Sequence, residues 1–108
     1  MMEDKVINAF DFLINNYNCS FNFEENGGNY YIYQSETFKL KIYVCEQFDE
    51  LDINLIYNEE CFHIDPYLED CSLITKRKGI KGFFFNYSKE FWTVVSNIVK
   101  ERMKEILK

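Results

Sequence analysis

The chain has little of what breaks or loosens a fold. Its 108 residues include one proline and four glycines, and no stretch is dominated by Pro, Gly or Ser. We therefore expect neither flexible linkers nor low-complexity segments. No apolar run approaches the ~18 residues of a membrane-spanning helix. With 47% hydrophobic and 19% aromatic residues, we expect a single domain over residues 1–108 with its own core.

Signatures of export and of a disulfide scaffold are also missing. The stretch Met1–Lys5 is acidic and no apolar h-region follows it, so we expect no secretory signal. The four cysteines have wide spacings and form no C-x-x-C pair: Cys19, Cys45, Cys61 and Cys71. These features predict a soluble, cytoplasmic protein whose thiols are free and lie mostly in the core.

No catalytic or cofactor motif is present. The glycines form neither a phosphate loop nor a dinucleotide-binding pattern. Cys61, His63 and Asp65 alternate along one stretch, but a structural zinc site needs four converging ligands. Cys61 and His63, two apart on a strand, would lie ~7 Å apart, too far for a nucleophile–base pair. We expect no enzyme, no metal and no cofactor, with His63 a surface residue beside a buried or half-buried thiol.

Apolar residues at three- and four-residue spacing predict one helix over residues 3–17 and a second over 88–107. The first stripe is Val6, Ile7, Phe10, Ile14 and Tyr17, widened by Phe12 and Leu13. The second is Phe91, Val95, Ile98, Val99, Met103 and Ile106, with Trp92 and Val94 beside it. Ser88 is the expected N-cap of the second helix.

Between the helices the apolar period changes to two, which predicts strands. We expect them over Ser20–Glu25, Asn29–Gln34, Thr37–Val44, Glu50–Tyr57 and Cys61–Ile64. Asn26-Gly27-Gly28 predicts a hairpin turn, because Asn and Gly accept positive φ. Residues 65–70 are interpreted as a single helical turn and 76–82 as an exposed loop. Residues 83–85 form either a last short strand or a loop plug.

This order predicts an α+β fold: an N-terminal helix, an antiparallel five-strand meander and a C-terminal helix on the same sheet face, as a two-layer sandwich. The other face would carry Tyr and Ile among charges: Glu24, Tyr30, Ile32, Lys39, Lys41, Tyr43, Asp52, Asn54, Ile56 and His63. That mixture suits a recognition surface. It also suits a solvated face on which Tyr is simply a good strand former.

Charge is segregated along the chain. Residues 1–70 hold fifteen Asp or Glu and three Lys, a net charge of −12, whereas residues 71–108 hold nine Lys or Arg and three Glu, a net charge of +6. An acidic surface suits a basic partner, such as a protein that itself binds or cleaves nucleic acid. The expected partner-binding residues are Tyr43, Glu46, Asp49, Glu50, Asp52, Glu59, Glu60, Asp65, Glu69 and Asp70.

Two other hypotheses about the function remain open. The basic residues Lys76, Arg77, Lys78 and Lys81 are an alternative nucleic-acid-binding element of a regulatory, phage or mobile-element protein. The acidic half beside them would repel phosphate, so nucleic acid is the less favoured partner. In the third reading the chain is an oligomeric subunit that pairs through a sheet edge. The sequence leaves the oligomeric state open, and no membrane partner is expected.

Phe10-Asp11-Phe12-Leu13, the hairpin Asn26-Gly27-Gly28 and Thr37–Val44 resemble segments of the small immunity proteins of bacterial toxin–immunity systems, including those of contact-dependent growth inhibition. The size, the acidity, the wealth of residues with AT-rich codons and the helix–sheet–helix order are also similar. The resemblance implies a cytoplasmic protein that binds and blocks a basic, nuclease-like toxin domain.

Overall fold

The computed structural model describes residues 2–48, 50–64, 76–79, 82–85 and 89–107. Along the chain, the helices α1 (Met2–Ala9) and α2 (Phe12–Tyr17) precede seven strands and the helix α3 (Lys89–Ile106). The strands are β1 (Ser20–Glu25), β2 (Asn29–Gln34), β3 (Phe38–Cys45), β4 (Glu50–Tyr57), β5 (Glu60–His63), β6 (Lys76–Gly79) and β7 (Gly82–Phe85). The helical turn expected at 65–70 and the N-cap expected at Ser88 lie outside the described residues.

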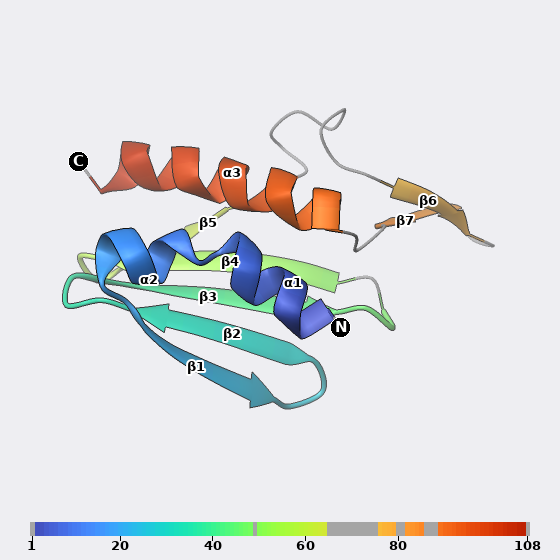
Figure 1. Cartoon of the computed structure of the whole chain (residues 1–108), viewed down its shortest axis with the longest axis horizontal. Helices are drawn as coiled ribbons and strands as arrows, with labels where there is room; N and C mark the ends of the chain where they lie inside the picture. Colours follow the sequence, from blue (N-terminus) through green and yellow to red (C-terminus); the bar gives the residue numbers. More distant parts are fainter. Residues whose placement is uncertain (1, 49, 65–75, 80–81, 86–88, 108) are drawn as a thin grey trace.

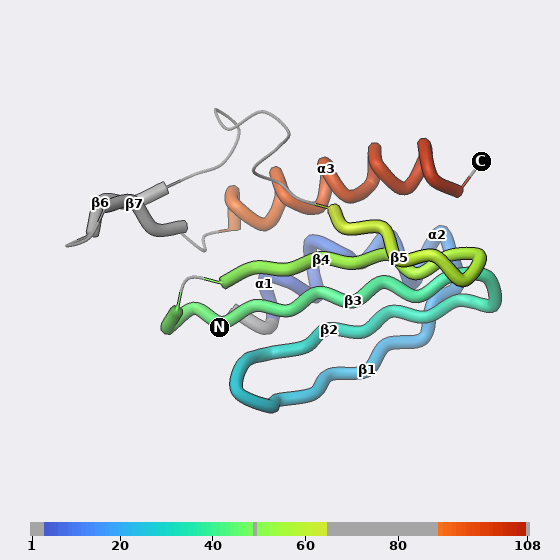
Figure 2. Tube along the Cα trace, turned by 180° about the vertical axis from the view of Figure 1, so that it is seen from behind, coloured from blue at the N-terminus to red at the C-terminus, as the bar shows by residue number. Residues whose placement is uncertain are grey.

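The first five strands form one antiparallel sheet in the order β1-β2-β3-β4-β5 (Figure 1). This confirms the predicted meander; β1, β2 and β4 have the predicted bounds, while β3 and β5 are each displaced by one residue. All three helices lie on one side of the sheet, and Figure 2, from behind, shows the strands in front of α1 and α2. The two-layer α+β sandwich is therefore confirmed.

The turn between β1 and β2 follows from its sequence. Gly27 has a φ of +73°, a conformation that costs glycine little because it has no Cβ. The Asn26 N–H donates a hydrogen bond of 3.0 Å to the Gly28 carbonyl oxygen, so the turn continues the strand pairing. The predicted hairpin is confirmed, and it sets the register of β1 on β2.

The single helix predicted over 3–17 is wrong, because the chain breaks between α1 and α2. Around the break the backbone hydrogen bonds run to the third residue back: Asp11 to Asn8 at 3.4 Å, Leu13 to Phe10 at 3.1 Å and Ile14 to Asp11 at 3.1 Å. This tighter winding changes which side later residues face. Leu13 becomes fully buried, whereas Ile14, expected in the apolar stripe, is 39% exposed.

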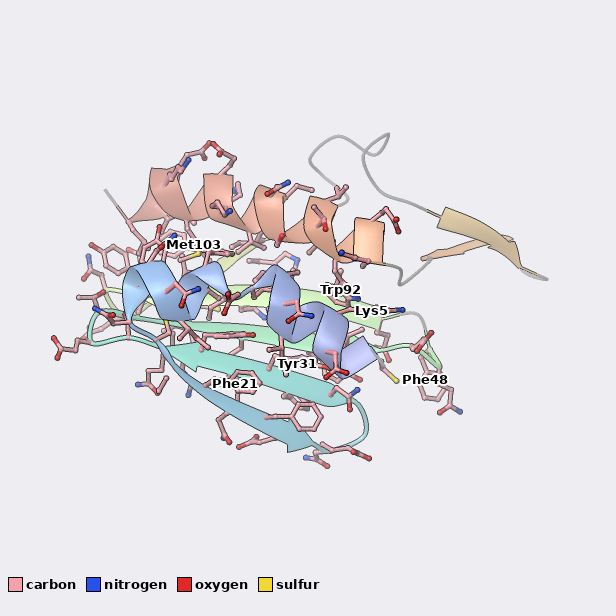
Figure 3. The ribbon with its side chains drawn as sticks, in the orientation of Figure 1. Lys5, Phe21, Tyr31, Phe48, Trp92 and Met103 are labelled. Atoms are coloured by element: carbon pink, nitrogen blue, oxygen red, sulfur yellow. The ribbon has the colours of Figure 1, made fainter. Side chains whose placement is uncertain are left out.

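The core lies between the helices and the inner face of the sheet. Trp92 of α3 is fully buried and packs edge-on against Phe91, with ring centroids 5.2 Å apart. The central strands contribute the fully buried residues Leu40, Ile42, Ile53 and Leu55, and β2 contributes Tyr31 and Tyr33. Figure 3 places Tyr31 and Trp92 near α1, and Met103 toward the far end of α3. The alternate inward positions predicted from the sequence thus form the core.

The strands β6 and β7 form a two-stranded sheet of their own. The exposed loop predicted over 76–82 is therefore wrong for Lys76–Gly79, which is a strand. The strand alternative for 83–85 is correct. The register pairs Gly79 with Gly82, so only two residues of the chain separate the two strands.

Candidate functional site

The strand register decides which side chains share the outer face of the sheet. Residues directly opposite one another in antiparallel strands lie on the same face. Tyr30, Tyr43 and Asp52 form one such row across β2, β3 and β4, and Ile32, Lys41, Asn54 and His63 form the next. The ten residues expected on the outer face all lie there, together with Asn22, Gln34 and Cys61.

Tyr43 is a half-buried side chain of the outer face that contacts several neighbours. Its ring lies 4.8 Å from the Tyr30 ring, centroid to centroid. It also covers Gly28, because a Cβ added to Gly28 would lie 2.5 Å from Tyr43 Cε1. Burial, then the Glu50 charge and a hydrogen bond with Cys45, raise the pKa of Tyr43. Cys45, the last residue of β3, lies on the same face and is only 6% exposed. Through its contacts with Tyr30 and Cys45, Tyr43 connects the outer face with the start of the β3–β4 turn.

A polar cluster crosses β4 and β5 beside that row. His63 Nδ1 lies 3.1 Å from Asp52 Oδ1 and 3.3 Å from Asn54 Oδ1. Both neighbours are acceptors, so they favour the proton on Nδ1. The Asn54 amide donates to Asp52 at 3.2 Å, and the Cys61 thiol lies 3.8 Å from Asn54 Oδ1. Among the residues described, no three His, Cys, Asp or Glu side chains are grouped to hold a metal ion.

A shallow hollow lies between the aromatic row and the polar cluster. Its volume is about 230 Å³, and it is lined by Tyr30, Lys41, Tyr43, Asp52, Asn54, Ile56 and Cys61. Small-molecule pockets usually exceed roughly 300 Å³ and enclose their ligand. Tyrosine and isoleucine beside one cation and one anion instead suit a single side chain from a protein partner.

The predicted acidic residues do not form one patch. Glu46 and Glu50 flank the β3–β4 turn, whereas Glu59 and Glu60 lie at the β4–β5 turn. These turns stand at opposite ends of β4, an eight-residue strand that spans ~26 Å at about 3.3 Å per residue. Of the other expected binding residues, Tyr43 and Asp52 lie on the outer face, while Asp49, Asp65, Glu69 and Asp70 lie outside the described part of the chain.

The β1–β2 and β3–β4 turns lie at the same end of the sheet (Figures 1 and 2). Between them is a hollow of about 360 Å³ lined by Glu25, Gly27, Gly28, Asn29, Val44, Cys45, Glu46 and Gln47. Phe48, in the β3–β4 turn, is 67% exposed. We call Glu25, Glu46, Phe48 and Glu50 the acidic end.

The sequence interpretation missed Glu25 and Phe48 as members of this site. The meander contained the signal, because its first and third turns must lie at the same end of the sheet. Glu59 and Glu60 belong to the β4–β5 connection, which lies at the opposite end of the sheet, the same end of the molecule as the last turns of α3 (Figures 1 and 2). The cations there pair within the helix: Arg102 with Glu105 at 2.9 Å and Lys104 with Glu101 at 3.2 Å.

The basic residues proposed for nucleic acid fall on β6. Lys76, Arg77 and Lys78 are consecutive in that strand, and Lys81 lies outside the described residues. Three described thiols, those of Cys19, Cys45 and Cys61, are free. Cys19 and Cys45 are buried, as expected for most of the thiols, whereas Cys61, expected to be buried or half-buried beside His63, is exposed. The reason is parity, since Cys61 is opposite Ile56 on the outer face.

No family model, curated protein or solved structure matches this chain. Within the described residues, no helix has the length and the apolar character needed to cross a membrane. The outer face and the acidic end are therefore the two surfaces on which a function can be proposed.

Proposed function

We propose that this chain is a non-enzymatic binding protein that neutralises a basic, nuclease-like toxin domain, in the manner of a bacterial immunity protein. The contact would be made by the acidic end. The observation that carries this proposal is that two separate turns lie at that end of the sheet, where Glu25 and Glu46 line one hollow. The exposed Phe48 follows in the β3–β4 turn, and Glu50 begins β4.

The chemistry of such a pair is complementary. A protein that cleaves or binds nucleic acid presents Lys and Arg to phosphate, and carboxylates placed against those cations replace the phosphate. Charges at the rim of an interface mainly raise the association rate and fix orientation. A large exposed aromatic such as Phe48 instead supplies buried apolar area in the complex and slows dissociation. The acidic end offers both parts.

The adjoining outer face would extend the contact. Tyr43 links the two surfaces, because it covers Gly28 beside the turn and packs on Tyr30 within the face. A partner that reached from Phe48 to the hollow at Tyr30 and Ile56 would meet tyrosine, isoleucine and balanced charges. Such residues favour the centre of an interface, with the carboxylates at its rim.

The test needs a candidate partner, and we would take a basic, nuclease-like domain encoded by a gene next to that of this chain. Binding would be measured by titration calorimetry, and protection by growth of cells that express the toxin. We expect Glu46→Lys combined with Glu50→Lys to weaken binding about 100-fold, because each reversal replaces attraction with repulsion. Protection should be lost, and the remaining binding should depend less on salt.

The matched control reverses two exposed carboxylates at the other end of the sheet, Glu36→Lys with Glu59→Lys. It makes the same change in net charge, so we expect at most about a 3-fold loss through the long-range field. Equal losses in the two pairs would contradict docking at the acidic end. A wild-type protein that neither binds the toxin domain nor protects cells from it would contradict the proposed function. Unchanged thermal unfolding would show that all variants are folded.

Phe48→Ala separates the apolar contribution from the charges. Because Phe48 is 67% exposed, its removal should leave the stability of the free protein almost unchanged. In the complex we expect about a 10-fold faster dissociation with little change in the association rate. Stopped-flow kinetics measures both rates, and a change confined to the association rate would exclude Phe48 as an anchor.

A further inference from the structure

The strand β1 (Ser20–Glu25) is an open edge of the sheet. Among the described residues it pairs with β2 alone, and Figure 2 shows it as the outermost strand. The other edge strand, β5, has four residues and leads within two residues into a part of the chain that the structure does not describe. A six-residue edge with free backbone groups is a template for another strand.

The backbone groups that face this open edge follow from the hydrogen-bond pattern. The Ser35 N–H donates to the Phe38 carbonyl oxygen at 2.9 Å, so that pair is a hydrogen-bonded one in the β2–β3 ladder. Because such pairs alternate along antiparallel strands, the odd-numbered residues of β2 bond to β3. The even-numbered ones, Tyr30, Ile32 and Gln34, therefore bond to β1.

In β1 the even-numbered residues are thus used by β2. The Asn26 N–H bond to the Gly28 carbonyl, at 3.0 Å, continues the same parity into the turn. The N–H and C=O groups of Phe21, Phe23 and Glu25 consequently point away from the sheet. Two phenylalanines at the centre of β1 hold the backbone groups that an added strand would meet.

The edge carries few of the features that keep strands apart. Ser20–Glu25 contains no Pro, Lys or Arg, and its two carboxylates are at one end. Phe21 and Phe23 are half-buried on the inner side, where their rings lie 5.0 Å from Tyr33 and 5.2 Å from Tyr31. In Figure 1, β1 lies beyond the helices. An added strand would cover apolar surface that the described helices leave open.

We propose that the occupant of this edge is a second copy of the chain, with β1 paired antiparallel to the partner's β1 about a two-fold axis at Asn22. This register sets Phe21 opposite the partner's Phe23, and Phe23 opposite the partner's Phe21. All four residues have edge-facing backbone groups, so four hydrogen bonds form between the strands. The five-strand sheets join into one continuous sheet, with helices on the same side in both copies.

Side-chain chemistry selects this register over its neighbours. Aromatic residues meet aromatic residues on the inner side, and Ser20 meets the partner's Glu24 on the outer side, so no two carboxylates face one another. A two-fold axis at Phe23 would set Glu25 against the partner's Phe21 and bring the two Glu24 closer. An axis between residues would turn the apolar side of one copy toward the polar side of the other.

Two lysine variants on the same face of β1 test the register. At the two-fold axis Asn22→Lys places two ammonium groups opposite each other and should weaken the dimer at least about 10-fold. Ser20→Lys places its ammonium opposite the partner's Glu24 and should leave the dimer unchanged or stronger. Both positions are exposed, so both variants should fold. Sedimentation equilibrium should give a wild-type mass that rises from 13.1 kDa toward twice that value with concentration.

A covalent readout uses the short distance at the axis. Residues in a non-hydrogen-bonded antiparallel pair have Cα atoms about 4.5 Å apart, within disulfide reach. Asn22→Cys, in a variant with Cys61→Ser, should form a disulfide-linked dimer under mild oxidation, whereas Glu24→Cys in the same background should not. A wild-type mass that stays at 13.1 kDa up to about 1 mM would overturn the proposal. Equal behaviour of Asn22→Lys and Ser20→Lys, or of the two cysteine variants, would also overturn it.

This inference is independent of the proposed function, because Ser20 and Asn22 are not in the acidic end. A toxin that binds the Asn22→Lys variant normally would leave the proposed function intact while the dimer is lost. A monomeric protein that still protects cells would refute the dimer alone.

Discussion

The two faces of the sheet are built from alternate residues of the same strands, yet they differ in almost every respect. On the inner face Leu40, Ile42 and Leu55 are fully buried under the helices. On the outer face Ile56 is 36% exposed, and polar contacts such as His63 with Asp52 lie open to solvent. The inner face therefore carries most of the stability, and the outer face can hold residues chosen for recognition.

The largest predicted difference between the faces compares two neighbours in β4. Leu55→Ala should lower the free energy of unfolding by about 2–5 kcal/mol, because it leaves a cavity in a core that is fully buried at this position. Ile56→Ala, on the outer face, should cost less than about 1 kcal/mol. Urea denaturation of both variants measures the difference. Similar losses would show that a bound surface, rather than solvent, covers the outer face.

The second prediction concerns the buried hydroxyl of Tyr33 on the inner face. Burial, followed by the nearby Tyr31, Asp11 and Cys19, raises the pKa of Tyr33 above its ordinary value of 10.0. The folded state therefore keeps the proton longer than the unfolded state, so this contribution is full below pH 10 and is lost as pH rises above it. The slope approaches about 1.4 kcal/mol per pH unit for one proton.

Tyr33→Phe removes that titration. Among the described residues the Tyr33 hydroxyl has no hydrogen-bond partner, so at neutral pH the substitution should change stability by less than about 1 kcal/mol. Between pH 10 and 11.5 the variant should lose stability about one proton's slope less steeply than the wild type. Denaturation curves across this range provide the measurement, and parallel slopes would contradict it.

The third prediction concerns the packing of Tyr43 on Gly28. Gly28→Ala must displace the ring, because the added Cβ would lie 2.5 Å from Tyr43 Cε1. The ring lies at the surface and can move, so we expect a cost of about 1 kcal/mol, at the low end for overpacking. Cys45 is only 6% exposed and its side chain is hydrogen-bonded with Tyr43, so displacement of the ring should let its thiol react faster with iodoacetamide. Peptide mass spectrometry follows it, with the exposed Cys61 as an internal control whose rate should not change.

The smallest effect is expected for the outer polar cluster. The His63 and Asp52 side chains are 54% and 51% exposed, and ion pairs in such positions contribute little. His63→Ala should therefore change the free energy of unfolding by less than about 0.5 kcal/mol at pH 7. A loss above about 1 kcal/mol would mean that this cluster helps to hold β5 on β4.

The prediction of strands succeeded and that of the first helix failed for different reasons. A strand's period of two survives small errors, since each of Phe38, Leu40 and Ile42 must face inward whatever the exact ends of β3. A helical stripe depends on unbroken winding. Once the bonds at Leu13 and Ile14 shorten to three residues, the later residues rotate and Ile14 leaves the core.

The candidate site was predicted in part. Alternation along each strand predicted that Tyr43 and Asp52 lie on the outer face, and the strand register confirms that they are opposite each other there. The sequence did not predict the acidic end, because Glu25 and Glu46 are far apart in the chain. They line one hollow only because two hairpins lie side by side. A count of carboxylates per segment contains no such information.

Alternation and turn chemistry in the sequence were enough to assign the strands, the β1–β2 hairpin and the inner and outer faces, because each depends on neighbours within a few residues. The break after α1, the packing of Tyr43 over Gly28 and the hollow shared by Glu25 and Glu46 belong to the tertiary structure. They depend on which strands and helices pack together, and packing brings close together residues that are far apart in the sequence.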